Sequence, residues 1–600
     1  MRRYLARHYA VCMELLFWVL VYGWLLFFKG DLLFRLQELS LFLWDGSIFA
    51  AQWESPAALL HYAALFLTQF CYLPWLGALL LTAGAWLLYR LVKKELALPL
   101  HLTPLALLPS LFVLLYVCRM GYDIYTLRAP APLFTPILGL VAAWGLFMLY
   151  SHLRPALLRV LLLAVVEVAG YPLIGVYSLL ALLLSLLHTL LSRPRLWGAA
   201  SVTALIAIAA VPYLYFRYVY LSVSLGLAWM AGFPVLDFSG DASPLYMLVL
   251  AACCLTVAAL PFKAVKATVP GWVMPLLMYG SLIALAWGSF NNENFNARLA
   301  MERAMNANRW DDALAVAAKA KNPTRVQVMY KNICLYKKGE LLDRMFSFPD
   351  GSAVVDKAPR GNFFQMCAPA IFFHTGLLNF CNRWAMEQRV QYGVSIDNLR
   401  YMAKVAVYQG EKELARKYLD MLGKTLFYRY LAKWYGEYLV QPEVMQRDGE
   451  YTLVAPLMSY DEEGLEDADF VETTLLHHYC NLQIANPQQL QLSLAALLTA
   501  KQSDETFWRQ FDRFTQTNRQ LPVHLMEAAL LFSYLSHDAT FHLSMVHMAG
   551  GQTSAINKRF QAFMNLLQAS PSRTPDATAS FKRQYGTTYW FYYYFVAIGE

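Results

Sequence analysis

The sequence predicts an all-α protein with a membrane-embedded helix bundle in its first half and a soluble array of helices in its second half. Hydrophobic residues make up 58% of the 600 residues and charged residues only 15%, which is too apolar for an ordinary soluble protein. Long apolar segments recur up to about residue 290, and amphipathic helices of modest length follow. The sequence therefore divides into a transmembrane helical domain, residues 1–290, and a soluble helical-repeat domain, residues 291–600.

The positive charge of the protein lies almost entirely in the predicted membrane domain. Residues 1–290 contain 17 of the 49 Lys and Arg residues but only 10 of the 41 Asp and Glu residues, and so carry +7 of the formal net charge of +8. The second half is close to neutral and offers no basic face, which argues against a nucleic-acid partner. The excess of basic residues instead indicates how the membrane segments are oriented.

Nine apolar segments are candidates for membrane-spanning helices, since a span needs about 20 mostly apolar residues. No small-residue cleavage site follows the first segment, so we expect a retained span and not a cleaved signal peptide. The candidates are Val11–Phe28, Pro74–Leu91, Thr103–Cys118, Leu133–Tyr150, Ala156–Val168, Leu173–Leu191, Ala199–Tyr215, Leu245–Phe262 and Trp272–Phe290.

Basic residues assign an orientation to these segments. With the N-terminus in the cytoplasm, the predicted inner loops hold 12 Lys and Arg residues and the outer loops hold 5. This is the distribution that the positive-inside rule describes. Nine spans from a cytoplasmic N-terminus place residues 291–600 outside. The sequence therefore predicts a multi-pass protein of the cytoplasmic (inner) membrane with an extracytoplasmic C-terminal domain.

The first outer loop, residues 29–73, carries charged residues on a predicted amphipathic helix. Asp31, Arg35, Glu38 and Asp45 fall on one side of a helix at 100° per residue, and leucines cover the opposite side. A helix with this pattern typically lies on the membrane surface with its charged side toward water. The alternative is that the charged side faces inward, over the helix bundle.

Further polar residues lie in or beside the other predicted outer loops. The second outer loop holds Arg119, Asp123 and Arg128, and Glu167 and Tyr171 lie near the outer end of the fifth span. An ionisable residue inside an apolar span is costly and usually faces a cavity or a partner. Carboxylates gathered on this side could hold a divalent cation, and arginines could bind a lipid phosphate through a bidentate fork.

Turn-forming residues recur in the second half of the sequence. Asn308, Gly339, Gly376 and Gly410 follow one another at intervals of 31, 37 and 34 residues. The residues five positions later are Ala313, Arg344, Cys381 and Ala415, of which three are small. NRWDDALAVA and QGEKELARKYL resemble the turn and second helix of a degenerate tetratricopeptide repeat, in which a small residue lets two antiparallel helices approach closely. The resemblance covers about residues 295–425.

The rest of the second half contains no motif that identifies a reaction. No phosphate-binding glycine loop, HExxH helix or GxSxG nucleophile elbow occurs anywhere in the sequence. We expect residues 350–362 to form an inserted loop and the acidic residues 461–472 a solvated linker. The seven consecutive aromatic residues Tyr589–Phe595 are expected to pack as a terminal helix, the alternative being an aromatic belt on the membrane.

The order of elements in the first half resembles the membrane glycosyltransferases of the C-type fold. The shared features are a short inner N-terminus, one span, a long outer loop with acidic residues, many further spans and an outer C-terminal domain. The resemblance implies transfer of a sugar from a polyprenyl-phosphate-linked donor, with an acidic residue of the first outer loop as base or metal ligand. The paired Asp-Glu motif of many members is absent. The chain also resembles an uncharacterised family of bacterial polytopic membrane proteins with C-terminal helical repeats, which implies no function.

Two functions are therefore carried forward. The first is a glycosyltransferase-like enzyme at the outer face of the membrane, for which a divalent cation is a candidate cofactor. Its catalytic candidates are Glu38, Asp31, Asp45 and Glu167, and its substrate-binding candidates are Arg119, Asp123, Arg128 and Tyr171. The second is a membrane-anchored scaffold or assembly factor whose repeat domain binds a protein or glycan. Convergence of the outer carboxylates would favour the enzyme, and their separation would favour the scaffold.

Overall fold

The computed structural model describes residues 2–96, 100–126, 131–192, 197–221, 225–233, 242–258, 272–353, 366–460, 471–482, 486–569 and 575–596. Every regular element in these ranges is helical, as the sequence predicts. The chain forms two compact units. Unit 1 comprises Met1–Asn292 together with Gln388–Arg400 and Arg416–Gly436, and unit 2 comprises the remaining residues. The predicted boundary near residue 290 is therefore close to the first boundary between units, but two later segments join unit 1.

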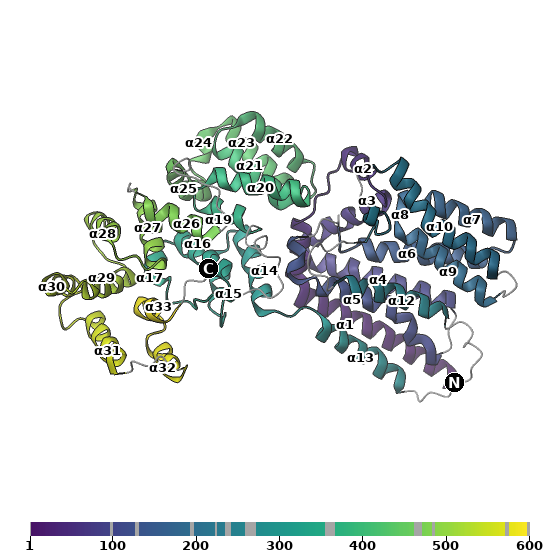
Figure 1. Ribbon diagram of the computed structural model, residues 1–600, viewed down its shortest axis with the longest axis horizontal. Helices are drawn as coiled ribbons and strands as arrows, with labels where there is room; N and C mark the ends of the chain where they lie inside the picture. The colour runs from purple at the N-terminus through teal and green to yellow at the C-terminus, as the bar shows by residue number, and fades with distance from the viewer. Residues whose placement is uncertain are drawn as a thin grey trace. The chain divides into compact units, whose positions relative to one another are not determined.

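The helices of the first 292 residues follow the predicted apolar segments (Figure 1). They are α1 (Arg2–Glu38), α2 (Gly46–Gln52), α3 (Ala58–Thr68), η1 (Gln69–Tyr72), α4 (Pro74–Leu96), η2 (Leu100–Leu107), α5 (Leu108–Arg119), η3 (Gly121–Tyr125), α6 (Thr135–His152), α7 (Ala156–Val168), α8 (Gly170–Ile174), α9 (Val176–Ser192), α10 (Trp197–Tyr218), α11 (Leu225–Ala228), α12 (Ala242–Ala258) and α13 (Val273–Gly288).

Three helices among the described residues are long and apolar enough to cross a membrane: Val11–Glu38, Pro74–Leu96 and Thr135–His152. The other predicted spans coincide with shorter helices, reach into residues outside the described ranges or, for Ala199–Tyr215, lie within the 22-residue helix α10, which is not one of these three. The count of nine spans therefore stays a prediction.

Apolar side chains at helical spacing hold the bundle of unit 1 together. α1 packs against α4, α4 against α6, and α6 against α9. Phe17, Val21 and Leu25 repeat every fourth residue on α1 and are completely buried, as are Leu81 and Leu88 on α4. Residues three or four positions apart share one face of a helix, so each helix presents an apolar stripe to its neighbour.

The first outer loop does not contain a separate amphipathic helix. α1 continues without a break to Glu38, so Asp31, Arg35 and Glu38 lie on its last two turns, whereas Asp45 lies beyond its end and caps α2. The prediction that Asp45 shares a helical face with the other three was wrong. The chain leaves the helix because its backbone finds other partners: the Ser40 carbonyl accepts from the Ile396 N–H at 3.1 Å, and the Trp44 N–H donates to the Lys424 carbonyl at 2.8 Å.

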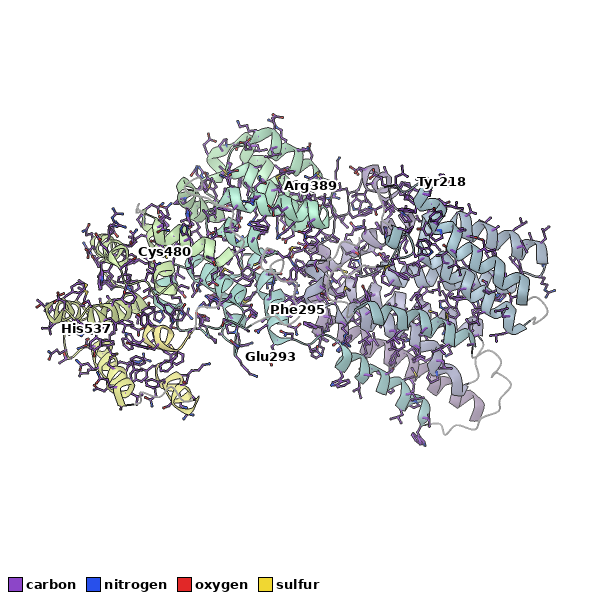
Figure 2. The ribbon with its side chains drawn as sticks, viewed as in Figure 1. Tyr218, Glu293, Phe295, Arg389, Cys480 and His537 are labelled. Atoms are coloured by element: carbon purple, nitrogen blue, oxygen red, sulfur yellow. The ribbon has the colours of Figure 1, made fainter. Side chains whose placement is uncertain are left out.

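The second half of the chain is a succession of helices. They are α14 (Glu293–Asn306), α15 (Trp310–Ala317), α16 (Arg325–Lys337), α17 (Leu341–Arg344), α19 (Ala368–His374), α20 (Leu378–Tyr392), α21 (Ile396–Tyr408), α22 (Lys412–Gly423), α23 (Arg429–Val440), α24 (Pro442–Met445), α25 (Gly449–Val454), η6 (Ala455–Tyr460), α26 (Val471–Asn481), α27 (Pro487–Thr499), α28 (Glu505–Thr517), α29 (Val523–Leu535), α30 (Ala539–Met548), α31 (Ala555–Ala569), α32 (Pro575–Tyr585) and α33 (Tyr589–Phe595). The first turn of α14 shows their amphipathic character, since Phe295 is 2% exposed and Glu293 is exposed (Figure 2).

One type of turn ends six of these helices. A residue with positive φ is followed by a residue whose N–H donates, over 2.8–3.0 Å, to the carbonyl five positions earlier, which is the hydrogen bond of a Schellman motif. The positive-φ residues are Asn308, Gly339, Gly376, Gly410, Lys501 and Gly550. The first four are the predicted turn positions, and the last two continue the pattern beyond the predicted repeat region. The tetratricopeptide resemblance itself stays a prediction.

The small residues that follow these turns are buried. Ala313, Cys381 and Ala415 are completely buried, whereas Arg344 is exposed and pairs with Glu340. The small side chains of Ala313, Cys381 and Ala415 allow the helices of each pair to approach closely. Arg344 interrupts this pattern because its side chain points to solvent.

The aromatic segment Tyr589–Phe595 forms α33, which packs as expected. Tyr589 and Trp590 are completely buried, and the Trp590 indole donates to the Glu527 carbonyl on α29 at 2.8 Å. The Glu527 carboxylate accepts from the Tyr589 N–H at 2.8 Å, and burial raises its pKa to about 8.

The expected loop and linker lie mostly outside the described residues. Positions 354–362 of the loop and 461–470 of the linker are not described, and Glu472 lies in α26. Glu472 is not solvated there, because Arg325 donates to both of its carboxylate oxygens.

Candidate functional site

The end of α1 and the start of α21 form a ring of four charged side chains. Arg35 donates from Nη1 to Glu38 Oε2 at 3.0 Å and from Nη2 to Asp397 Oδ2 at 2.9 Å. Arg400 donates to the other oxygens of the same carboxylates, from Nη1 to Glu38 Oε1 at 3.2 Å and from Nη2 to Asp397 Oδ1 at 2.7 Å. All four residues belong to unit 1. We call them the ion-pair ring, in which two arginines balance two carboxylates.

Local sequence sets the geometry of both sides of the ring. The two residues from α1 are three positions apart, as are the two from α21, so each pair lies on one face of its helix. Ser395 and Asn398 fix the start of α21. The Asn398 N–H donates to Ser395 Oγ at 3.2 Å, and the Ser395 N–H donates to Asn398 Oδ1 at 3.0 Å. Asp397 therefore lies in the first turn, where the helix dipole favours a carboxylate.

The ring is buried and electrically neutral. Its side chains are between 1% and 9% exposed. Burying a charge is costly unless the charge is paired and hydrogen-bonded, and the ring supplies both conditions. Burial by itself would raise the pKa of Asp397, but Arg35 and Arg400 outweigh it and hold that pKa below its ordinary value. The Asp397 carboxylate is therefore suited to fastening the two helices together and poorly suited to accepting a proton from a substrate.

Aromatic and amide groups surround the ring. The Arg35 guanidinium lies over the Tyr125 ring, 5.4 Å from its centroid, which is a cation–π arrangement. The Tyr428 hydroxyl donates to Gln37 Oε1 at 2.9 Å, and burial raises the pKa of Tyr428 well above its ordinary value. Tyr125 comes from the predicted second outer loop, so the structure brings residues of the two predicted loops together.

Asp45, another acidic residue of the predicted first outer loop, has partners of its own outside the ring. Asp45 caps α2 by accepting from the Ser47 N–H at 3.0 Å, and it pairs with Lys424 at 2.9 Å. The hydrogen bonds from Ser47 and Lys424 lower its pKa. Asp31 is half-buried on α1. The cap and the ion pair give Asp45 a structural explanation that needs no substrate.

The remaining predicted site residues that the structure describes lie on α5, η3, α7 and α8. Arg119 is exposed and Asp123 is half-buried, while Arg128 lies outside the described residues. Tyr171 is 1% exposed, and its hydroxyl donates to the Ala228 carbonyl at 2.6 Å. Glu167 on α7 is half-buried and forms no hydrogen bond or ion pair with the described part of the chain. Glu167 therefore does not share an ion-pair network with Glu38, nor with Asp123.

No candidate metal centre occurs in the residues that the structure describes. Within these ranges no three His, Cys, Asp or Glu side chains come together in a way that could hold a metal ion. The nine cysteines are all free thiols.

Sequence reasoning missed Asp397 and Arg400, the partners of Glu38 and Arg35. They are 362 residues away along the chain from the α1 residues to which they bind. A local signal did exist, since SIDNLRYMA places this charged pair in an otherwise apolar and amide-rich helix start. Nothing in that signal identified where the partners lie.

Comparison with known proteins gives a family and no activity. The sequence model of a family of unknown function (DUF6057) matches residues 6–596. No curated protein and no solved structure matches the chain. The match covers nearly all of both units.

Proposed function

Because the chain belongs to this family of unknown function, we propose its role from its own structure: a membrane-anchored scaffold or assembly factor. The first half anchors the protein in the cytoplasmic membrane, and the second half presents a helical surface to a protein or glycan partner at the outer face. The main observation behind this proposal is the ion-pair ring. It supports the predicted orientation of the chain in the membrane and a structural role for Glu38.

Exposed apolar side chains support a lipid environment for unit 1. On α1, Phe27 is 81% exposed, and on α7, Leu157 and Val160 are 70% and 64% exposed. On α13, Ile283 and Trp287 are 71% and 88% exposed. Large apolar surfaces of this kind mark contact with a membrane or another protein. Their occurrence on three helices of high hydropathy favours the membrane.

The ring also supports the predicted orientation. If α1 crosses the membrane once, its ends lie on opposite sides, and Arg35 and Glu38 mark the end remote from the N-terminus. Asp397 and Arg400 pair with them and must lie on that same side. An odd number of spans before residue 291 meets this requirement, as the distribution of basic residues also does.

Reporter fusions test this orientation. Alkaline phosphatase fused after Asn296 should be active, and a reporter that works only in the cytoplasm should be silent there. Fusions after Leu96, in a predicted inner loop, provide the control and should give the opposite pattern. An inactive phosphatase at Asn296 together with an active one at Leu96 would refute the orientation.

The ring favours the scaffold over the glycosyltransferase. Both oxygens of Glu38 accept hydrogen bonds from guanidinium groups, and Asp45 caps a helix and pairs with Lys424. A base needs a free lone pair directed at the substrate, and a metal ligand needs neighbouring ligands. The scaffold gives these same residues a structural purpose.

Two double variants distinguish the functions. Glu38→Gln with Arg400→Gln removes the candidate base but leaves the Arg35–Asp397 pair neutral. Arg35→Gln with Asp397→Asn is the matched control, because it removes the same number of charges and keeps Glu38 and Arg400. For a scaffold, both variants should complement a deletion strain equally at equal protein level. If only the variant that lacks Glu38 fails, the enzyme hypothesis is favoured and the scaffold is refuted.

A further inference from the structure

Helix α23 has an exposed face that combines aromatic and basic side chains. Tyr430 and Trp434 are four positions apart and are 54% and 55% exposed. Arg429 and Lys433 are also four positions apart, and both are exposed. Residues at this spacing share one side of a helix, so the aromatic pair and the basic pair form two neighbouring rows. All four residues belong to unit 1, and we call them the α23 face.

The protein does not neutralise the two basic side chains of this face. Arg429 donates to the Thr425 carbonyl at 3.3 Å, and neither Arg429 nor Lys433 forms an ion pair within the described part of the chain. Residues 416–436, the segment of unit 1 that contains them, carry five basic residues and one acidic residue. The second half of the chain as a whole is close to neutral, so this segment concentrates positive charge. A surface of this kind attracts a negatively charged partner.

The residues before α23 place its start beside the start of α4. The Phe427 ring stacks on the Tyr72 ring with the centroids 4.6 Å apart, and the Tyr428 ring meets the Tyr72 ring edge-on at 5.4 Å. Tyr72 comes two residues before Pro74, the first residue of α4, which is one of the three helices long and apolar enough to span a membrane. Two residues extend over at most about 7 Å, and the headgroup layer on each side of a bilayer is roughly 5–8 Å thick. Where α4 crosses the membrane, α23 therefore begins at about the depth of the headgroups.

We propose that the α23 face docks on the membrane surface and binds the headgroups of anionic phospholipids. Tyrosine and tryptophan favour this layer, because their rings are apolar and their polar tips can form hydrogen bonds there. Arg429 and Lys433 complement the lipid phosphates in charge, and the arginine can hold one phosphate through two N–H groups. A protein partner would not require the face to lie beside the start of a span, so the position favours lipid. The inference rests on the membrane anchor of the proposed function and adds the class of lipid that the protein contacts.

Photo-crosslinking from position 434 tests the proposal. The full chain, with p-benzoylphenylalanine in place of Trp434, is inserted into nanodiscs of phosphatidylcholine with or without phosphatidylglycerol, and mass spectrometry measures the yield of lipid adduct. One basic side chain beside an anionic membrane strengthens the attraction about fivefold, so two of them favour the docked state by roughly 25-fold. The adduct yield should therefore be at least about fivefold higher when phosphatidylglycerol is present. The control places the same crosslinker at Leu543, which is 57% exposed on α30, a helix without lysine or arginine, and it should give little adduct in either nanodisc.

Charge variants assign the adduct to this face. Arg429→Gln with Lys433→Gln, added to the crosslinking chain, should abolish the preference for phosphatidylglycerol. Lys412→Gln with Lys417→Gln is the matched control, because it removes the same charge from exposed positions of α22 and should reduce the preference less than about twofold. All four side chains are exposed, so the thermal midpoints should stay within about 2 °C of the unsubstituted chain, which separates lost docking from lost folding.

The same crosslinker in intact cells distinguishes lipid from protein. Lipid adducts support the proposal, whereas a protein adduct without any lipid adduct would overturn it in favour of a protein partner. Equal yields at positions 434 and 543, or a yield that does not depend on phosphatidylglycerol, would overturn it as well. A chain that inserts into nanodiscs but gives no adduct at position 434 contradicts this inference alone, and a chain that does not insert contradicts the membrane anchor too.

Discussion

Removing one charged side chain from the ion-pair ring should destabilise the protein more than removing one partner of an exposed ion pair. Arg400→Gln leaves Glu38 and Asp397 to share Arg35, so a net negative charge remains where the side chains are at most 9% exposed. Leaving a buried charge without its partner costs about 3–5 kcal/mol. At about 2.1 cal/mol/K of unfolding entropy per residue, this corresponds to a fall of roughly 4–7 °C in the thermal midpoint of a unit of this size.

The assay is fluorescence-detected thermal unfolding of the full chain in nanodiscs. Arg383→Gln is the control, because Arg383 pairs with Glu387 at 3.1 Å while both side chains are 45–47% exposed. It should cost about 0.2–1 kcal/mol, or at most roughly 1–2 °C. Adding Glu38→Gln to Arg400→Gln restores neutrality and should recover part of the loss. The reasoning is refuted if Arg400→Gln costs no more than Arg383→Gln, or if the two ring substitutions are additive.

Three further predictions concern packing, titration and a single hydrogen bond. Ala313→Trp should overpack the completely buried space behind Ala313 and cost about 1–3 kcal/mol, whereas Ala315→Trp at an exposed position of the same helix should be tolerated; thermal midpoints compare them. Burial raises the pKa of Glu527 to about 8, so the folded state retains a proton that the unfolded state releases at lower pH. The free energy of unfolding of the wild type should therefore fall by up to about 4 kcal/mol as the pH rises from 5 to 8. Glu527→Gln should lack this loss, and equal pH dependence of the two midpoints would contradict it. Tyr428→Phe should cost about 1–3 kcal/mol by leaving Gln37 Oε1 buried without its donor, as chemical or thermal unfolding would measure.

The sequence predicts the local features of the fold well. Hydrophobic periodicity depends on residues three and four positions apart, so it marks the helices of both units. Gly339, Gly376 and Gly410 were found because glycine adopts positive φ without a steric penalty. Lys501 also has a positive φ, but lysine is not a residue type that indicates this conformation, so the turn at Lys501 was missed.

Features that depend on distant residues were not predicted. The sequence predicts that Arg35 and Glu38 form the solvent-facing side of an interfacial helix, because leucines surround them in the sequence. Their burial follows from Asp397 and Arg400, and a sequence pattern contains no information about contacts across such a separation. The end of α1 was missed for the same reason, since the partner of the Ser40 carbonyl is the Ile396 N–H.

The separation of 362 residues within the ring has a consequence in time. Translation proceeds at about 5–20 residues per second, so Arg35 and Glu38 are synthesised roughly 20–70 s before Asp397 and Arg400 exist. During that interval Arg35 and Glu38 lack the two partners from α21 that complete the ion-pair ring. The last turn of the first helix can reach its final state only after two thirds of the chain has left the ribosome. A nascent chain that stalls earlier therefore displays an incomplete ion pair, which distinguishes it from the finished protein.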